Sequence, residues 1–176
     1  QIMENWAAHP DVLKTYAKHY QTGEVIPDEL IAKLEAASKF NQGFVTVEYT
    51  AASILDMDYH TLTDASGVVA NDFEEASMKR IGLIDEIIPR YKSNYFQHIF
   101  AGGYSAGYYS YMWSEVLDKD AFNAFVENSL FDQATASSFR ENILEKGGSR
   151  EEMEMYVNFR GTEPSIDALL KGRGLE

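Results

Sequence analysis

The residues best suited to chemistry lie in the segment 91–115, where six tyrosines and one histidine surround a pair of glycines. Tyr104, Tyr108 and Tyr111 follow the spacing i, i+4, i+7, which predicts that they share one face of a helix. A buried phenol needs a partner for its hydroxyl, so a stripe of tyrosines is typical of a polar cleft wall. Gly102-Gly103 would let the backbone approach a ligand closely or act as a hinge. An ordinary aromatic core is the alternative for the same residues.

Other kinds of catalytic site have little support in the sequence. The chain has no cysteine, and no Gly-x-Ser-x-Gly turn follows a strand pattern. The four histidines do not form a His-Glu-x-x-His helix, and no two of them are three or four residues apart; they are His9, His19, His60 and His98. We therefore expect this chain by itself to bind no metal ion.

The acidic residues are interpreted as parts of helices rather than as catalytic pairs. Asp56 and Asp58 are two apart, so on a helix their side chains point in different directions. Asn71 with Glu74, and Ser149 with Glu152, have the spacing of capping boxes, in which the acid lies in the first helical turn.

Hydrophobic residues recur at helical spacing along nearly the whole chain, and no useful run of strand alternation occurs. Prolines, glycines and cap-like residues divide this pattern into helices. The expected helices cover about residues 10–20, 28–40, 44–62, 71–81 and 104–117, followed by four shorter ones around residues 122–126, 139–143, 153–157 and 166–170. No linker or internal repeat divides the chain. We predict an all-α fold, with residues 1–176 forming a single helical unit.

Composition and charge exclude several classes of protein. Of 176 residues, 45% are apolar and 24% charged, as in globular domains. The net charge of −13 would repel nucleic acid phosphates and anionic lipid headgroups, so neither is an expected partner. No apolar run approaches the ~20 residues of a membrane span. The chain opens on a helical pattern without a cap residue, which we interpret as the start of a piece cut from a longer protein.

The segment from His98 to Glu115, which reads His-Ile-Phe-Ala-Gly-Gly-Tyr-Ser-Ala-Gly-Tyr-Tyr-Ser-Tyr-Met-Trp-Ser-Glu, resembles a known family. It is similar to the substrate-binding loop and helix of the peptidyl-dipeptidase and oligopeptidase A branch of the thimet-oligopeptidase family of zinc peptidases. The segments 4–10, 44–58 and 159–175 are similar to other parts of the same family. The resemblance runs through essentially the whole chain in order, and it implies a helical peptidase fold.

The resemblance also implies roles for individual residues. Tyr111 maps to the tyrosine whose hydroxyl stabilises the oxyanion of the tetrahedral intermediate. Tyr104 and His98 map to groups that contact the substrate backbone and the oxyanion region. Gly102-Gly103 would close over the bound oligopeptide, beside Tyr108. The group that binds the substrate's C-terminal carboxylate is left open, with three cationic candidates: Arg90, Lys92 and Arg160.

The zinc motif of the family, His-Glu-x-x-His, and its third ligand, a glutamate, would precede Gln1. The resemblance therefore implies the C-terminal part of the catalytic region of a longer peptidase, whose zinc and general base belong to a missing N-terminal part. This chain alone would be inactive. The family favours a cytoplasmic location and an oligopeptide substrate. The alternative is a stand-alone helical module that binds peptides without catalysis.

Overall fold

The computed structural model describes residues 1–175, which are predominantly helical. The only β-pairing among them is an isolated antiparallel bridge between Lys18 and Val25, so the all-α prediction is confirmed. The elements in chain order are α1 (Ile2–Ala8), α2 (Pro10–Tyr16), α3 (Asp28–Ser38), α4 (Gln42–His60), α5 (Ala70–Arg80), the 3₁₀ turn η1 (Ser93–Tyr95), α6 (Gln97–Phe100), α7 (Ser110–Asn128), α8 (Gln133–Phe139), the π-helical segment η2 (Arg140–Leu144), α9 (Glu152–Arg160) and α10 (Asp167–Arg173).

The chain groups into two compact units, which are described separately. The first unit contains Gln1–Phe40 together with the chain from Trp113 onward, and the second contains Asn41–Met112. The prediction that the chain forms a single helical unit stays a prediction.

In the second unit, α4 is the central element. Ala51 and Ala52 on α4 are at most 1% exposed. Their small side chains let neighbouring elements approach the helix closely. One cluster joins Ala52 to the aromatic segment that follows α5, and its buried members include Phe96 and Ile99. A second cluster joins α4 to α5 through Leu55 and Met78. Both clusters depend on the broad apolar face that the sequence predicts for residues 44–62.

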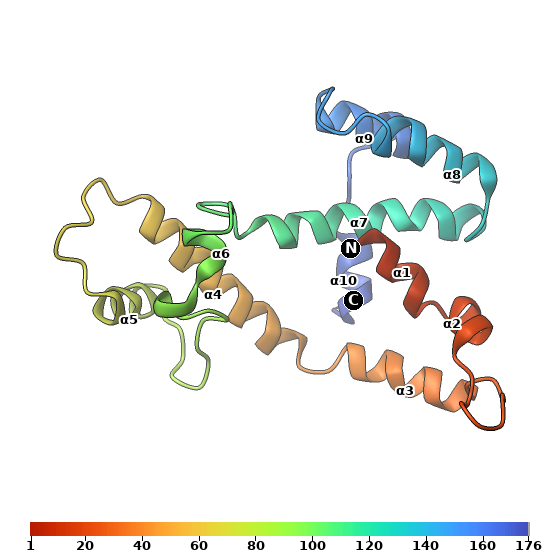
Figure 1. Ribbon diagram of the computed structural model, residues 1–176, viewed down its shortest axis with the longest axis horizontal. Helices are drawn as coiled ribbons and strands as arrows, with labels where there is room; N and C mark the ends of the chain where they lie inside the picture. Colours follow the sequence, from red (N-terminus) through yellow and green to blue (C-terminus); the bar gives the residue numbers. More distant parts are fainter. Residues whose placement is uncertain (176) are drawn as a thin grey trace. The chain divides into compact units, whose positions relative to one another are not determined.

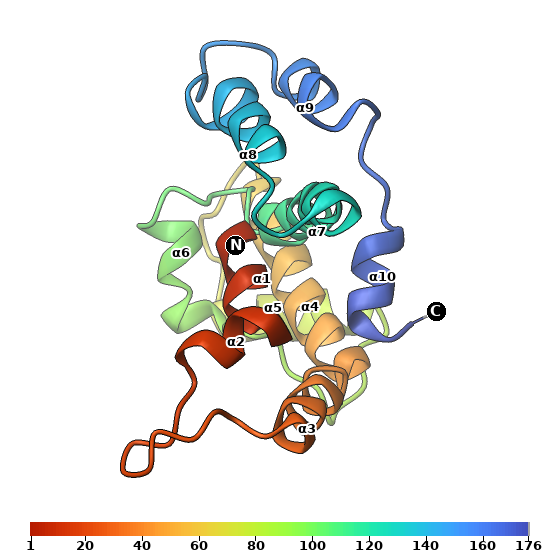
Figure 2. The same ribbon diagram turned by 90° about the vertical axis from the view of Figure 1, so that its right-hand side faces the viewer.

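In the first unit, the part of α7 from Trp113 onward is the central element. The α8–α9 hairpin lies on one side of it and α10 on the opposite side (Figures 1 and 2). The Trp6 ring of α1 packs edge-on between Phe122 and Phe125, with ring centroids 4.7 and 4.6 Å away. Trp6 also donates its indole N–H to the carbonyl of Leu130 at 2.9 Å.

Several predicted boundaries are wrong. Helix α2 ends at Tyr16 rather than near residue 20, because the chain turns into the Lys18–Val25 bridge. Residues 104–109 form turns, and α7 begins only at Ser110. The two helices expected around residues 104–117 and 122–126 are therefore joined, from Ser110, into the single helix α7.

Both predicted capping boxes are also wrong. The residue preceding α5 is Val69, which provides no side-chain cap, and the carboxylate of Glu74 binds Ser93 instead. The cap of α9 is Glu151, whose carboxylate accepts the N–H of Glu154 at 2.7 Å.

The helices of residues 1–175 include none that is both long enough and apolar enough to cross a membrane.

Candidate functional site

All six residues predicted to form the site belong to the second unit. They follow one another from α6 through a loop to the first turn of α7; they are His98, Gly102, Gly103, Tyr104, Tyr108 and Tyr111. The structure therefore brings them together through a short stretch of chain, whose course sets their mutual geometry.

The rings of Tyr104 and Tyr111 are stacked, with centroids 5.2 Å apart and planes inclined by 21°. The His98 ring lies 6.0 Å from Tyr104 and 5.9 Å from Tyr108. Tyr104 is 37% exposed, whereas His98 and Tyr111 are half-buried. The cluster thus has an accessible side on which hydroxyl and imidazole groups meet.

Tyr104, Tyr108 and Tyr111 lie close together for a different reason than the shared helix face that the sequence predicts. Tyr104 and Tyr108 precede α7, so they do not share a helix face with Tyr111. The chain instead turns between them, with the N–H of Gly107 bonded to the carbonyl of Tyr104 at 2.8 Å and that of Ser110 to Gly107 at 3.0 Å. The stack depends on these turns rather than on helical periodicity.

Tyr108 differs from the other two tyrosines because it is only 3% exposed. Its ring meets Phe96 edge-on at 4.9 Å and belongs to the core cluster around Ala52. Burial raises the pKa of the Tyr108 hydroxyl to about 12, partly opposed by the charge of Arg90. Tyr108 therefore packs in the core next to the site, and its ring exposes little surface to a ligand.

Local backbone geometry explains why glycines occupy positions 102 and 103. A Cβ on Gly102 would lie 2.8 Å from the carbonyl oxygen of His98, so a side chain there would collide with the backbone of α6. Gly103 has φ of +81°, in the left-handed region that favours glycine. The two residues together fold the loop back onto α6, where the N–H of Tyr104 bonds to the His98 carbonyl at 3.2 Å.

The hydroxyl of Tyr111 is held in its protonated form. Its hydrogen bond to Tyr104 is the main cause, and burial adds to it; together they raise the pKa of Tyr111 to about 12. A phenol with that pKa remains a hydrogen-bond donor throughout the neutral range. Such a donor, placed beside a reacting carbonyl, stabilises negative charge that develops on its oxygen.

Sequence reasoning missed several residues that build this site. Tyr91 stacks on Phe96 at 5.2 Å and lies 5.2 Å from the His98 ring. Tyr49 on α4 donates its hydroxyl to the carbonyl of Tyr108. The carboxylate of Asp56, fully buried in α4, accepts backbone N–H groups of the loop. The only feature of the sequence that could have indicated a role for Asp56 is its position as an acidic residue within the most apolar helix.

The three candidates for binding a substrate carboxylate have different surroundings. Arg160, in the first unit, is paired with both carboxylate oxygens of Glu127, at 2.9 and 2.7 Å. The ammonium of Lys92 lies 3.5 Å from Glu74. Arg90 is exposed, and its guanidinium lies 6.0 Å from the centre of the Tyr91 ring. Arg90 is thus the candidate linked to the aromatic cluster.

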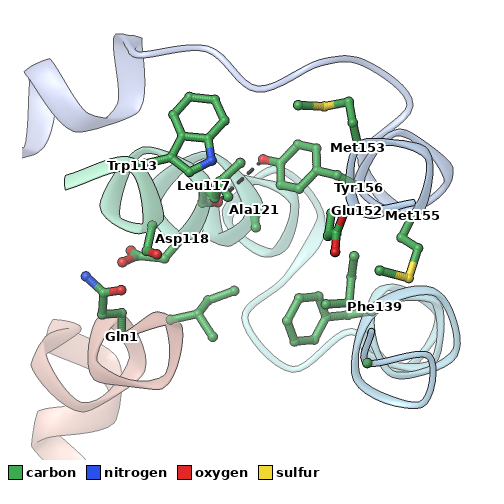
Figure 3. Close-up of a pocket in the computed structure, with 14 residues that line it drawn as sticks. Gln1, Trp113, Leu117, Asp118, Ala121, Phe139, Glu152, Met153, Met155 and Tyr156 are labelled. Atoms are coloured by element: carbon green, nitrogen blue, oxygen red, sulfur yellow. Dashed lines mark hydrogen bonds between the residues drawn. The ribbon is translucent and has the colours of Figure 1, made fainter. Parts of the chain in front are cut away.

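A separate cavity of about 490 Å³ lies within the first unit (Figure 3). Side chains of α7, α8 and α9 line it, among them Leu117, Phe139 and Met155. The Tyr156 hydroxyl lies 3.4 Å from the Leu117 carbonyl oxygen and donates a hydrogen bond to Asp120. None of the six predicted site residues lines this cavity. Its lining is mostly apolar, with Asp118, Glu152 and Tyr156 among the polar side chains.

Within residues 1–175, no group of three or more His, Asp or Glu side chains is placed to hold a metal ion. The described residues therefore do not provide a ligand set for zinc.

Comparison with known proteins gives consistent results. The profile of "Peptidase family M3" matches residues 1–175. Dipeptidyl carboxypeptidase of Escherichia coli is 42% identical over 177 residues, covering 99% of the chain and 26% of the relative. Probable cytosolic oligopeptidase A of Arabidopsis thaliana is 41% identical over 183 residues, and Oligopeptidase A of Escherichia coli is 37% identical over 178, covering 99% and 100% of the chain and 26% of each relative. The chain thus spans about a quarter of the length of these relatives.

Proposed function

The chain belongs to peptidase family M3, and from this premise we propose that it forms the substrate-binding and oxyanion-stabilising part of a zinc metallopeptidase that hydrolyses oligopeptides. The resemblance to peptidyl-dipeptidases favours release of dipeptides from the C-terminus of the substrate. The observation that carries the proposal is the stacked pair of Tyr104 and Tyr111, whose geometry keeps the Tyr111 hydroxyl protonated beside an accessible surface.

In the proposed mechanism, Tyr111 acts when the scissile carbonyl becomes tetrahedral. Its O–H then turns from the Tyr104 oxygen to the new oxyanion, which is the stronger acceptor because it is charged. Tyr104 and His98, on the accessible side of the cluster, hold the substrate backbone so that its carbonyl reaches Tyr111. Gly102-Gly103 brings this loop over the peptide.

We propose that the zinc ligands, which would supply the Lewis acid, and the general base belong to another part of the same polypeptide, since the relatives are about four times as long as the chain. Contact with that part also gives a role to apolar side chains at the start of α4, where Phe44, Val45 and Val47 are between 41% and 45% exposed. The isolated chain would accordingly show no peptidase activity and would self-associate or bind apolar dyes. Activity that survives chelation and purification controls would contradict this assignment.

We further propose a cytoplasmic location, supported by the similarity to Probable cytosolic oligopeptidase A of Arabidopsis thaliana. Recovery of the polypeptide with membranes or organelles after cell fractionation would contradict it.

The test of the function is Tyr111→Phe in the full-length polypeptide. The change removes one hydroxyl and almost no volume, so the fold should persist. A donor used only in the transition state lowers kcat and kcat/KM by similar factors, with KM little changed. The expected loss is about 10²-fold or more, equivalent to about 3 kcal/mol of barrier. Tyr104→Phe should be milder and should raise KM.

Tyr109→Phe is the matched control, because Tyr109 adjoins the site in sequence but is 55% exposed. It should leave catalysis nearly unchanged. Equal damage from Tyr109→Phe and Tyr111→Phe, with the fold intact, would contradict the assignment. A silent Tyr111→Phe would remove the oxyanion role from this residue. The mass of the natural gene product separates this function from a stand-alone peptide-binding module, for which about 20 kDa is expected, close to a single domain.

A further inference from the structure

A fully buried carboxylate binds the loop between Tyr104 and Tyr111. Asp56, near the C-terminal end of α4, is 0% exposed. Its Oδ1 accepts the backbone N–H of Ala106 and its Oδ2 accepts that of Tyr108, each at 2.9 Å. Each carboxylate oxygen therefore holds one amide of the segment that joins Tyr104 to Tyr111.

The neighbouring turn of α4 supplies a third partner. The Nδ1 atom of His60 lies 2.8 Å from Oδ1 of Asp56 and 2.9 Å from the backbone carbonyl of the same residue. An N–H on this nitrogen would donate to Oδ1, the oxygen that also accepts the N–H of Ala106. The ring thus limits the rotation of the Asp56 side chain, as groups that orient a reactive or binding side chain do.

The segment that Asp56 holds has an unfavourable backbone conformation. Ala106 has φ of +55°, in the left-handed region, which costs a non-glycine residue about 1–2 kcal/mol. Hydrogen bonds to a charged acceptor contribute about 1.5–3 kcal/mol each. The two hydrogen bonds from backbone N–H groups to Asp56 are therefore sufficient to stabilise this turn despite the unfavourable φ of Ala106.

We propose that Asp56, oriented by His60, is a positioning residue for the oxyanion donor. It holds the segment 104–108 in the one conformation that stacks Tyr104 on Tyr111, and it thereby determines where the Tyr111 hydroxyl is presented. The inference rests on the proposed function of Tyr111. A side chain that served only the packing of α4 would instead affect the whole unit without acting through Tyr111.

Asp56→Asn in the full-length polypeptide tests the proposal, with Asp58→Asn as the matched control. Asn replaces one acceptor oxygen with an NH₂ group, so one of the two loop amides loses its partner. Asp58 lies two residues further along the same helix and binds Arg80 at 2.6 Å and the hydroxyl of Ser77, remote from the loop. The two variants therefore carry the same chemical change on different sides of α4.

The first measurement is hydrogen exchange at the loop amides. In Asp56→Asn we expect exchange at Ala106 or Tyr108 to accelerate by about 10-fold or more, because a charge-assisted hydrogen bond is lost. Asp58→Asn should leave both amides unchanged. Unchanged exchange at both amides in Asp56→Asn would overturn the proposal, whatever the activity of the enzyme.

The second measurement is a double-mutant cycle with Tyr111→Phe. Misplacement of the donor by about 1 Å would make Asp56→Asn lower kcat by about 10- to 100-fold when Tyr111 is present. In the Tyr111→Phe background the same change should cost less than about twofold, because the residue through which Asp56 acts is already lost. An equal loss in both backgrounds would show a merely structural role and overturn the proposal.

The two measurements separate this inference from the function on which it rests. If Tyr111→Phe is silent, the proposed function fails. Hydrogen exchange at Ala106 and Tyr108 still tests whether Asp56 stabilises the loop. If Asp56→Asn does not fold, His60→Gln takes its place, since the His60 side chain is 25% exposed and the carboxylate remains. It should show both effects at smaller amplitude, and the absence of both would overturn the proposal.

Discussion

The two compact units use buried acids in different ways. In the second unit, Asp56 and Glu74 accept backbone N–H groups: Asp56 those of Ala106 and Tyr108, and Glu74 that of Ser93. In the first unit, Asp118 and Asp120 accept from side chains of other helices, namely Asn5 of α1 and Tyr156 of α9. A carboxylate bonded to amides determines the course of a loop, whereas one bonded to side chains fastens one helix to another.

The difference indicates where the geometry of the chain has to be accurate. The loop that Asp56 holds joins Tyr104 to Tyr111, the pair that we propose for catalysis, and turns have no ladder of hydrogen bonds to define their conformation. The helices of the first unit have such ladders, so their acids set only the packing between elements. Substitutions in the second unit should therefore have local effects, and those in the first unit should change the stability of the whole unit.

The largest effect on stability is expected for Asp120→Ala. Asp120 is 5% exposed, accepts the Tyr156 hydroxyl at 2.5 Å and lies 3.5 Å from Nε of Arg160. Its loss removes the acceptor of the buried Tyr156 hydroxyl and the carboxylate beside Arg160, which should lower the free energy of unfolding by about 3 kcal/mol. Chemical denaturation of the chain measures this change. Glu127→Ala is the control, since the Glu127 side chain is 55% exposed, and it should cost less than about 1 kcal/mol.

Glu74→Gln should have a smaller and more local effect. Oε2 of Glu74 accepts the N–H of Ser93 at 2.8 Å and its hydroxyl at 2.9 Å. Loss of the charge weakens both bonds, so we expect a loss of about 1–2 kcal/mol, with faster hydrogen exchange confined to the segment around Ser93. The adjacent Glu75→Gln, whose exposed side chain pairs with Lys79, should leave the free energy of unfolding nearly unchanged. Uniform loss of protection throughout the unit would contradict the contrast between local and global effects.

Asp118→Asn should act in the opposite direction. Desolvation is the main cause that raises the pKa of Asp118, so the protonated form is more favoured in the folded state than in the unfolded chain. The stability that this preference contributes is present below the ordinary pKa and is lost as the pH rises through the raised one. At neutral pH the charge is therefore unfavourable, and a neutral amide should raise the free energy of unfolding by up to about 1 kcal/mol. A loss of stability in thermal denaturation at neutral pH would show that the charge is needed.

The smallest effect is confined to alkaline pH. The pKa values of Tyr108 and Tyr111 are raised to about 12, so folding favours their protonated forms. Their contribution to stability is complete below the ordinary pKa of 10.0 and is lost between pH 10.0 and about 12. A tyrosinate absorbance titration should show late ionisation, and Tyr111→Phe should remove one late step. Titration of every tyrosine near pH 10.0 would contradict the enclosed geometry of the cluster.

The helices themselves were largely predictable. Pro27-Asp28 marks the start of α3, the break at Asn41 precedes α4, and the irregular chain before Ser93 follows from the residues around Pro89. These features are local, because proline and glycine act on their own dihedral angles and apolar spacing acts within a few turns. The membership of the site stays a prediction, which rests on the spacing of the tyrosines and on the family resemblance of the segment from His98 to Glu115.

What the sequence by itself determined is therefore the all-α class, most of the helices and the peptidase family, and it proposed the six candidate residues. Only the tertiary structure decided how those residues meet: Tyr104 stacks on Tyr111 across turns rather than along a helix, and Tyr108 is drawn into the core. The physical reason is that a carboxylate on α4, about fifty residues earlier in the chain, holds the loop with Ala106 in a left-handed conformation. No local pattern encodes a contact between such distant positions, because it arises only when the helix and the loop pack together.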